Sequence, residues 1–155
     1  PADKWPSHHG HEKLGLDSIK TFSKRLKAPN DCRDLGLLVS EYHSHVHRAF
    51  ELKASTILGV LNRCDVWRKP ERFKEFLITC SADARGRTSF ETRPYPHADY
   101  IWQAYKAAQQ VDVKAIVAKG FQGKEIKQQL EQTRIVAITE FKNNYKDTSK
   151  YRTKW

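Results

Sequence analysis

Six of the seven histidines lie in two short clusters, and they are the residues with the clearest capacity for chemistry. One cluster falls within residues 8–11, where a loop is expected to become a helix. The other falls within residues 43–47, at the end of the next helical segment. Imidazole is the commonest side-chain ligand of divalent transition metals and the usual acid–base group near neutral pH. In a hairpin of two helices of nearly equal length, the start of one meets the end of the other, so His8 or His11 could approach His43.

Asp83 is a third residue of chemical interest, because it ends an apolar helical pattern and is followed by two arginines. Its carboxylate could ligate a metal, while Arg85 and Arg87 could hold a phosphate through bidentate hydrogen bonds. Asp83 could equally pair with Arg87 and only pin the loop. Likewise, a histidine-rich turn on a basic surface is often merely solvated, and histidines at alternate positions within 43–47 cannot all face one side of a helix. These patterns by themselves leave both interpretations open.

The chain of 155 residues is strongly basic, with 28 Lys and Arg against 18 Asp and Glu and a formal net charge of +10. Such a charge indicates an anionic partner, and nucleic acid is the first candidate because phosphate neutralisation dominates that kind of affinity. A soluble basic protein without such a partner is the simpler alternative.

The cysteines and the lack of long apolar runs indicate a reducing, aqueous compartment. Cys32, Cys64 and Cys80 form no CxxC pair, which favours buried free thiols over a disulfide framework or a zinc site. No apolar run approaches the roughly 18 residues needed to span a bilayer, and no signal-peptide pattern opens the chain. We therefore expect a cytoplasmic protein with no membrane partner. Since methionine is absent and the first residues do not resemble a natural start, we expect the C-terminal part of something longer.

The elements that must position these residues are all predicted to be helical. Apolar residues recur with helical spacing, as in the stripe formed by Leu14, Ile19, Phe22 and Leu26. Gly15 within this stripe suggests close approach to a neighbouring helix, because glycine lowers intrinsic helicity. The helices are expected at residues 12–27, 30–47, 54–64, 71–84, 98–110 and 113–119, with a last helix after residue 123.

Local signals mark several helix ends and one long loop. Asn30 or Asp31 is the expected cap of the second helix, Pro70 opens the fourth, and Gly120 stops the sixth. The loop at 85–96 is the one long irregular segment, and such loops in compact domains are often functional.

Five motifs occur in an order that is specific to one family. They are Trp-Pro-x-His-His-Gly-His-Glu-x-x-Gly at 5–15, Glu-Tyr-His at 41–43, Trp-Arg-Lys-Pro at 67–70, Ala-Asp-Ala-Arg-Gly-Arg at 82–87 and Lys-Gly-Phe-Gln-Gly-Lys-Glu-Ile at 119–126. Together they resemble the bacterial CCA-adding enzymes, in the form that carries an HD phosphohydrolase domain. The resemblance covers nearly the whole chain, and several separate motifs in order are more specific than any one of them.

This resemblance implies a fold and two activities. The fold is a partial HD-domain helical bundle over residues 1–93, followed by tRNA-contacting helices and a basic tail over residues 94–155. For the full-length protein, one activity is a nucleotidyltransferase reaction that adds or repairs CCA at tRNA 3′ ends with CTP, ATP and Mg²⁺. The other is phosphohydrolase chemistry, as 2′,3′-cyclic phosphodiesterase, 2′-nucleotidase and phosphatase, with Ni²⁺ or a similar divalent metal.

By the same resemblance, His11 and His43 are catalytic and metal-binding residues, and Asp83 is a further metal ligand. The HD superfamily builds its metal site from an early histidine, an adjacent His-Asp dyad and a late aspartate. Two departures matter. The dyad would lie before residue 1, and Ser44 stands where many relatives have aspartate. We therefore expect this chain alone to have neither activity.

The partner that the resemblance implies is tRNA, contacted at the phosphates of its acceptor and TΨC arms. Such contacts recognise the shape of A-form RNA rather than its bases. Tyr95, Trp102 and Tyr105 are expected to serve mainly in packing. The competing hypotheses are a non-catalytic helical RNA-binding module and, with less support, a dimerisation domain, so both monomer and homodimer stay open. The expected phosphate-binding residues are Arg68, Lys69, Arg72, Arg85, Arg87, Arg93, Lys124 and Lys127.

Overall fold

The computed structural model describes residues 10–145, and within this range every regular element is helical. The expected all-α fold is therefore confirmed. His8, His9 and the expected basic tail after residue 145 lie outside the described residues. The elements are α1 (His11–Arg25), α2 (Asn30–His47), the short 3-10 turn η2 (Ala49–Glu51), α3 (Ala54–Arg63), α4 (Pro70–Arg85), α5 (His97–Gln109), α6 (Val113–Ala118) and α7 (Lys124–Asn144).

Most helix ends follow the local signals in the sequence, and one does not. Pro70 is the first residue of α4, where its missing N–H is no loss, and Gly120 adopts φ 86° just after α6. The second helix differs, because neither Asn30 nor Asp31 caps it. Asn30 is already the first helical residue, and its side-chain oxygen instead accepts a hydrogen bond from Arg33 at 3.0 Å.

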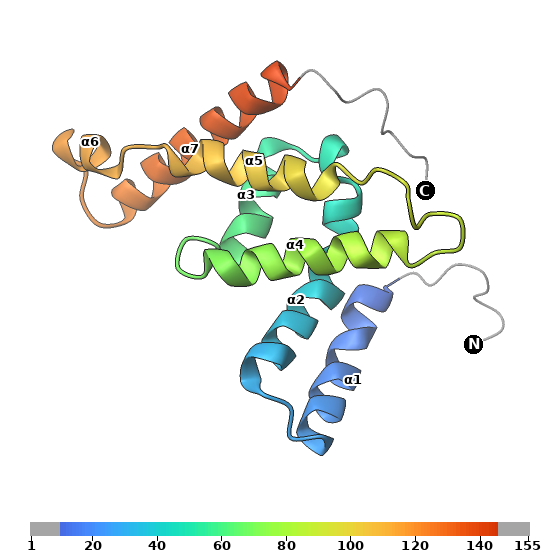
Figure 1. Cartoon of the computed structure of the whole chain (residues 1–155). Coiled ribbons are helices and arrows are strands. Elements are labelled where there is room, and N and C mark those ends of the chain that lie inside the picture. The colour runs from blue at the N-terminus through green and yellow to red at the C-terminus, as the bar shows by residue number, and fades with distance from the viewer. Residues whose placement is uncertain (1–9, 146–155) are drawn as a thin grey trace.

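The helices form a body and a projecting hairpin (Figure 1). Helix α4 runs across the middle of the molecule, with α3, α5 and α7 on one side of it and the α1–α2 hairpin on the other. Helix α1 packs against α2, and the last turns of α2 pack against α4. Because α2 joins the hairpin to the body, residues near its end are brought close to both α1 and α4.

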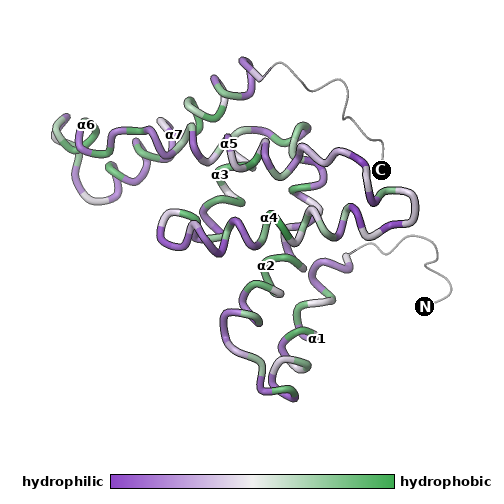
Figure 2. Tube along the Cα trace, viewed as in Figure 1, coloured by the Kyte–Doolittle hydropathy of each residue, from purple (hydrophilic) through white to green (hydrophobic). Residues whose placement is uncertain are grey.

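The hydrophobic core lies in the body, and each of the helices that contribute to it alternates between apolar (green) and polar (purple) residues along its trace (Figure 2). It includes residues from the end of α2, from α3, α4 and α5, and Ile138 of α7. One core contains residues from both sides of position 93. The expected division into two domains, 1–93 and 94–155, stays a prediction. The largest fully buried side chains of the core are Tyr100, Phe73, Phe76, Ile57, Leu61, Ile101 and Ile138.

Helices α1 and α2 approach each other closely where small residues meet. A Cβ atom on Gly15 would lie 2.7 Å from the Ser40 hydroxyl, which is closer than real Cβ atoms come. That hydroxyl donates a hydrogen bond to the Glu12 carbonyl at 3.0 Å. The close approach predicted from Gly15 is therefore confirmed, and it holds the start of α1 against the end of α2.

One expectation about burial is wrong, that for Cys32, and the apolar stripe of α1 is exposed for the same physical reason. Leu14, Phe22 and Leu26 belong to the apolar stripe of α1, yet they are 74%, 55% and 57% exposed. Cys32 in the first turn of α2 is also exposed, although Cys64 and Cys80 are buried free thiols as expected. Among the described residues, α1 packs against α2 along one face only. Apolar residues with helical spacing in this region can therefore stay exposed.

A buried histidine, His97, makes the fold sensitive to acid. It is 5% exposed, its ring lies 4.7 Å from the Phe50 ring and 4.8 Å from the Tyr95 ring, and its Nδ1 atom is buried without a hydrogen-bond partner among the described residues. Desolvation lowers the pKa of His97 from 6.5 to about 4. Between these two pH values the unfolded chain binds a proton that the folded chain does not.

We therefore expect the free energy of unfolding to fall as pH falls from 6.5 towards 4, by about 2–3 kcal/mol from this group. His97→Phe should keep the ring packing and abolish this contribution. Urea denaturation at pH 7 and pH 4.5 gives the change in the free energy of unfolding for each protein. Subtracting the change in His97→Phe from that in the unaltered protein removes the contribution of the other titrating groups. Parallel losses of stability in the two proteins would show that His97 is not the acid-sensitive group.

Candidate functional site

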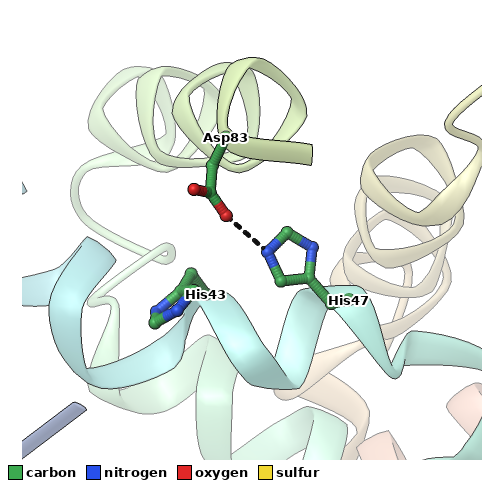
Figure 3. A group of neighbouring side chains, drawn as sticks. All are labelled: His43, His47 and Asp83. Carbon is green, nitrogen blue, oxygen red and sulfur yellow. Dashed lines mark hydrogen bonds and ion pairs between the residues drawn. The ribbon is translucent and has the colours of Figure 1, made fainter. Parts of the chain in front are cut away.

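Two histidines of α2 and one aspartate of α4 converge where these helices meet (Figure 3). His43 and His47 are four residues apart and therefore lie on one face of α2, while Asp83 points at them from the last turns of α4. One potential ligand atom from each of the three lies within 4.8 Å of the others. Among residues 10–145, no other group of three histidine, cysteine or acidic residues has this spacing.

The hydrogen bonds of His43 determine which of its ring nitrogens carries the proton. Its Nδ1 lies 2.8 Å from the Val39 carbonyl and 3.2 Å from the Ser40 carbonyl, and carbonyls can only accept. Nδ1 must therefore carry the proton, which leaves the Nε2 lone pair of neutral His43 available as a ligand or a base.

His11 meets His43 through this same nitrogen, as the hairpin geometry predicted. The two Nε2 atoms are 3.2 Å apart and the ring centroids 5.2 Å apart. His11 is about half exposed, with its Nδ1 atom 3.6 Å from a Glu12 oxygen. Since His43 presents a lone pair, the two rings can share a proton or a cation between them.

His47 is held from both sides, by Asp83 and by Tyr95. Its Nε2 lies 2.8 Å from an Asp83 oxygen and its Nδ1 2.7 Å from the Tyr95 hydroxyl. An ionised carboxylate can only accept, so Nε2–H donates to Asp83 and Nδ1 accepts from Tyr95. Burial lowers the pKa of His47 despite the nearby Asp83 carboxylate, which keeps the imidazole neutral near pH 7.

Tyr95 permits this arrangement to reverse. A hydroxyl both donates and accepts, so the His47 proton can sit on Nδ1 instead of Nε2. Nδ1–H then donates a hydrogen bond to the Tyr95 oxygen, and the lone pair of Nε2 becomes available to a metal. Burial raises the pKa of Tyr95, so its hydroxyl stays protonated in either arrangement.

Ser44 proves to hold a carboxylate that comes from the other helix. Its hydroxyl donates to the Glu12 side chain at 2.9 Å. Hydrogen bonding to its own backbone and to Ser44 lowers the pKa of Glu12, which therefore stays ionised beside His11. The position at which the resemblance implied a missing aspartate thus still has an acidic group next to it.

The donor set suits a divalent transition metal. Two imidazole nitrogens and one carboxylate oxygen match the preferences of zinc, nickel, cobalt and iron, and three protein ligands leave positions open for a substrate. Ligand atoms around a tetrahedral zinc lie roughly 3.4 Å apart, so ligand atoms within 4.8 Å of one another need only small side-chain shifts.

The arrangement differs in part from the set expected from the resemblance, which was His11, His43 and Asp83. His43 and Asp83 do come together, but the third member of the group is His47, and His11 lies beside His43. His47 could have been found from its four-residue spacing to His43. His45 belongs to the same run but is not part of the group, and its buried Nδ1 has no partner in the described chain.

The eight basic residues expected at phosphates do not form one patch. Arg68, Lys69 and Arg72 lie at the start of α4, and Arg85 and Arg87 at its end, and a helix of 16 residues separates these ends by about 24 Å. All are exposed except Arg72, which is half-buried.

Several of these basic residues already have partners within the chain. Arg68 forms a bidentate pair with Asp65, in which Nε donates to Oδ1 and Nη2 donates to Oδ2, each at 2.8 Å. Arg72 donates to the Cys64 carbonyl at 3.2 Å. Arg93 lies in the loop after α4, with its guanidinium 4.8 Å from the Phe90 ring. Lys124 and Lys127 are exposed in the first turn of α7.

Comparison with known proteins identifies the relatives of this chain. A multifunctional CCA protein of Pseudoalteromonas atlantica is 65% identical over 138 residues, which are 89% of this chain and 34% of the relative. A multifunctional CCA protein of Psychromonas ingrahamii is 49% identical over 145 residues, which are 94% of this chain and 36% of the relative. Over these residues, the chain belongs to the family of the multifunctional CCA proteins.

The chain spans about a third of the length of these multifunctional CCA proteins. No protein-family model and no solved structure matches it. Among residues 10–145, no helix combines the length and the apolar character that crossing a membrane requires.

Proposed function

We propose that this chain forms part of a metal-dependent phosphohydrolase site in a CCA-adding tRNA nucleotidyltransferase. The observation that carries the proposal is the convergence of His43, His47 and Asp83, with His11 in contact with His43. The similarity to multifunctional CCA proteins supports the choice of tRNA as substrate and partner. The compartment that we propose is the cytoplasm.

Each side chain has a distinct role in this proposal. His43, His47 and Asp83 are the ligands of a divalent metal such as Ni²⁺, which when bound supplies Lewis acidity towards a phosphate ester. The Val39 carbonyl orients His43, and the Tyr95 hydroxyl accepts a hydrogen bond from His47 Nδ1–H when Nε2 is needed as a ligand. His11, exposed and oriented by Glu12, is placed to exchange a proton with the substrate.

The chain by itself lacks part of what the proposed activities require. The His-Asp dyad of the HD superfamily does not occur in it, and nucleotidyl transfer from CTP and ATP with Mg²⁺ is assigned to the remaining part of the full-length protein. We propose that the present residues supply one wall of the phosphohydrolase site and a basic surface for tRNA. The formal charge of +10 also favours the second candidate, a non-catalytic helical RNA-binding module.

Titration with Ni²⁺ or Co²⁺, followed by NMR of the histidine side chains, distinguishes these two functions. If the cluster binds metal, the signals of His11, His43 and His47 should shift or broaden together at low metal concentration, because one ion touches or adjoins all three. Changes confined to His8 and His9 would favour the non-catalytic module.

A further inference from the structure

A second basic feature lies at the opposite end of the α1–α2 hairpin from the histidines. It is a pocket of about 570 Å³ between the end of α1 and the start of α2. Four cationic side chains line it, against a single carboxylate, that of Asp34. Helix α1 has 15 residues, so the pocket lies roughly 20 Å from His11 along the helix axis. The four cations are Lys20, Lys24, Lys27 and Arg33.

Lys27 occupies a backbone position that normally belongs to glycine. Its φ is +50°, in the left-handed region, directly after the last turn of α1. The Lys27 N–H bonds the Lys24 carbonyl at 3.2 Å and the Ala28 N–H bonds the Ser23 carbonyl at 2.9 Å, which is the Schellman pattern. A lysine is less stable than glycine in this conformation, because its Cβ crowds the backbone. The local backbone therefore gives no reason for a lysine at this position. The pocket gives one, because the Lys27 side chain adds positive charge to its lining.

Two of the four cations have no acidic partner in the described chain. Lys20 pairs with Asp17 at 3.2 Å, and Arg33 pairs with Asp34 at 2.8 Å. Neither Lys24 nor Lys27 forms an ion pair with another residue of the range 10–145. The pocket thus keeps an excess of positive charge that its own residues do not neutralise.

Arg33 is the part of the pocket whose geometry is already fixed. Its Nε and one terminal nitrogen donate to Asp34 at 3.1 and 2.8 Å, and the other terminal nitrogen donates to Asn30 at 3.0 Å. A guanidinium has five N–H groups, so two remain for a ligand. An oriented arginine beside mobile lysine ammonium groups is a common way to bind a phosphate.

We propose that this pocket binds a backbone phosphate of RNA, and so provides an RNA contact on the hairpin separate from the arginines at the two ends of α4. The pocket itself indicates an anion, and the choice of RNA as that anion rests on the proposed function. It adds Lys24, Lys27 and Arg33 to the phosphate-binding residues, none of which was expected from the sequence. The unusual backbone of Lys27 makes the inference testable, because its replacement by glycine should affect folding and binding in opposite directions.

The test is Lys27→Gly in the whole chain, with a fluorescein-labelled tRNA as the probe. Glycine suits a positive φ, so the melting temperature should be equal to or above that of the unaltered protein. Affinity for tRNA should fall about threefold to tenfold at low salt, and the slope of log affinity against log salt should decrease by about 0.7–0.9. Lys13→Gln is the matched control, since Lys13 is exposed on the same helix but does not line the pocket.

Three outcomes decide the inference. A smaller salt slope in Lys27→Gly with an unchanged slope in Lys13→Gln supports it. Equal slopes in all three proteins, with clear salt dependence, overturn the pocket and leave the proposed RNA function intact. A flat salt response in the unaltered protein removes RNA from its partners and overturns both.

Discussion

Replacing Asp83 by asparagine should weaken the binding of Co²⁺ to this chain by about 100-fold, or roughly 2.7 kcal/mol. Asp83 contributes the one carboxylate in the group formed with His43 and His47. A neutral amide is a much poorer ligand for a divalent cation. Asparagine has nearly the same shape, and its side-chain oxygen can still accept the hydrogen bond of 2.8 Å that His47 donates, so the fold should be little affected.

The measurement is isothermal titration of Co²⁺ into both proteins at pH 7. Asp99→Asn is the matched control, because Asp99 is an exposed carboxylate of α5 that does not belong to the group. Equal affinities for the Asp83 and Asp99 variants would show that binding occurs elsewhere on the chain. The proposed metal site would then be abandoned.

Phe73→Ala should lower the free energy of unfolding by about 3–5 kcal/mol. The Phe73 side chain is fully buried, and its ring lies 5.7 Å from Phe76 and 6.3 Å from Tyr105. Its removal leaves a cavity between α4 and α5 that rigid neighbours cannot fill. Since domains of this size are stable by only about 5–15 kcal/mol, the variant should be near the limit of folding.

Ile78→Ala provides the control on the same helix. Ile78 is 67% exposed, so its truncation should change stability by no more than about 0.5 kcal/mol. Chemical denaturation followed by circular dichroism gives both values. Similar losses in the two variants would contradict the packing described for α4. Because α4 also carries Asp83, Phe73→Ala should weaken Co²⁺ binding as well, in proportion to the unfolded fraction.

The α1–α2 hairpin illustrates how far local patterns reach. The helix lengths alone placed the start of α1 beside the end of α2, and His11 does lie 3.2 Å from His43. Gly15 correctly indicated a close contact, which Ser40 makes. These features are predictable because they depend on residues close in sequence, whose geometry a helix and a short turn largely determine.

Burial and the composition of the histidine group could not be predicted in the same way. The apolar spacing of Leu14 and Phe22 indicated a helix but not whether this stripe is covered, and both residues are exposed in the structure. The resemblance assigned Asp83 to the site without indicating that its partner would be His47, from which it is 36 residues distant. Helical periodicity defines which residues share a face, but it does not say which other helix covers that face.

The sequence by itself therefore determined the helical character of the chain, the approximate ends of its helices, its basic charge and the family to which it is related. Only the tertiary structure decided that α2 packs on α4, which brings Asp83 to His43 and His47. It likewise decided that Lys27, in a left-handed conformation, lines a basic pocket. The physical reason is that periodicity and capping are local properties of the chain. A binding site depends on contacts between distant segments, which form only when the whole core is packed.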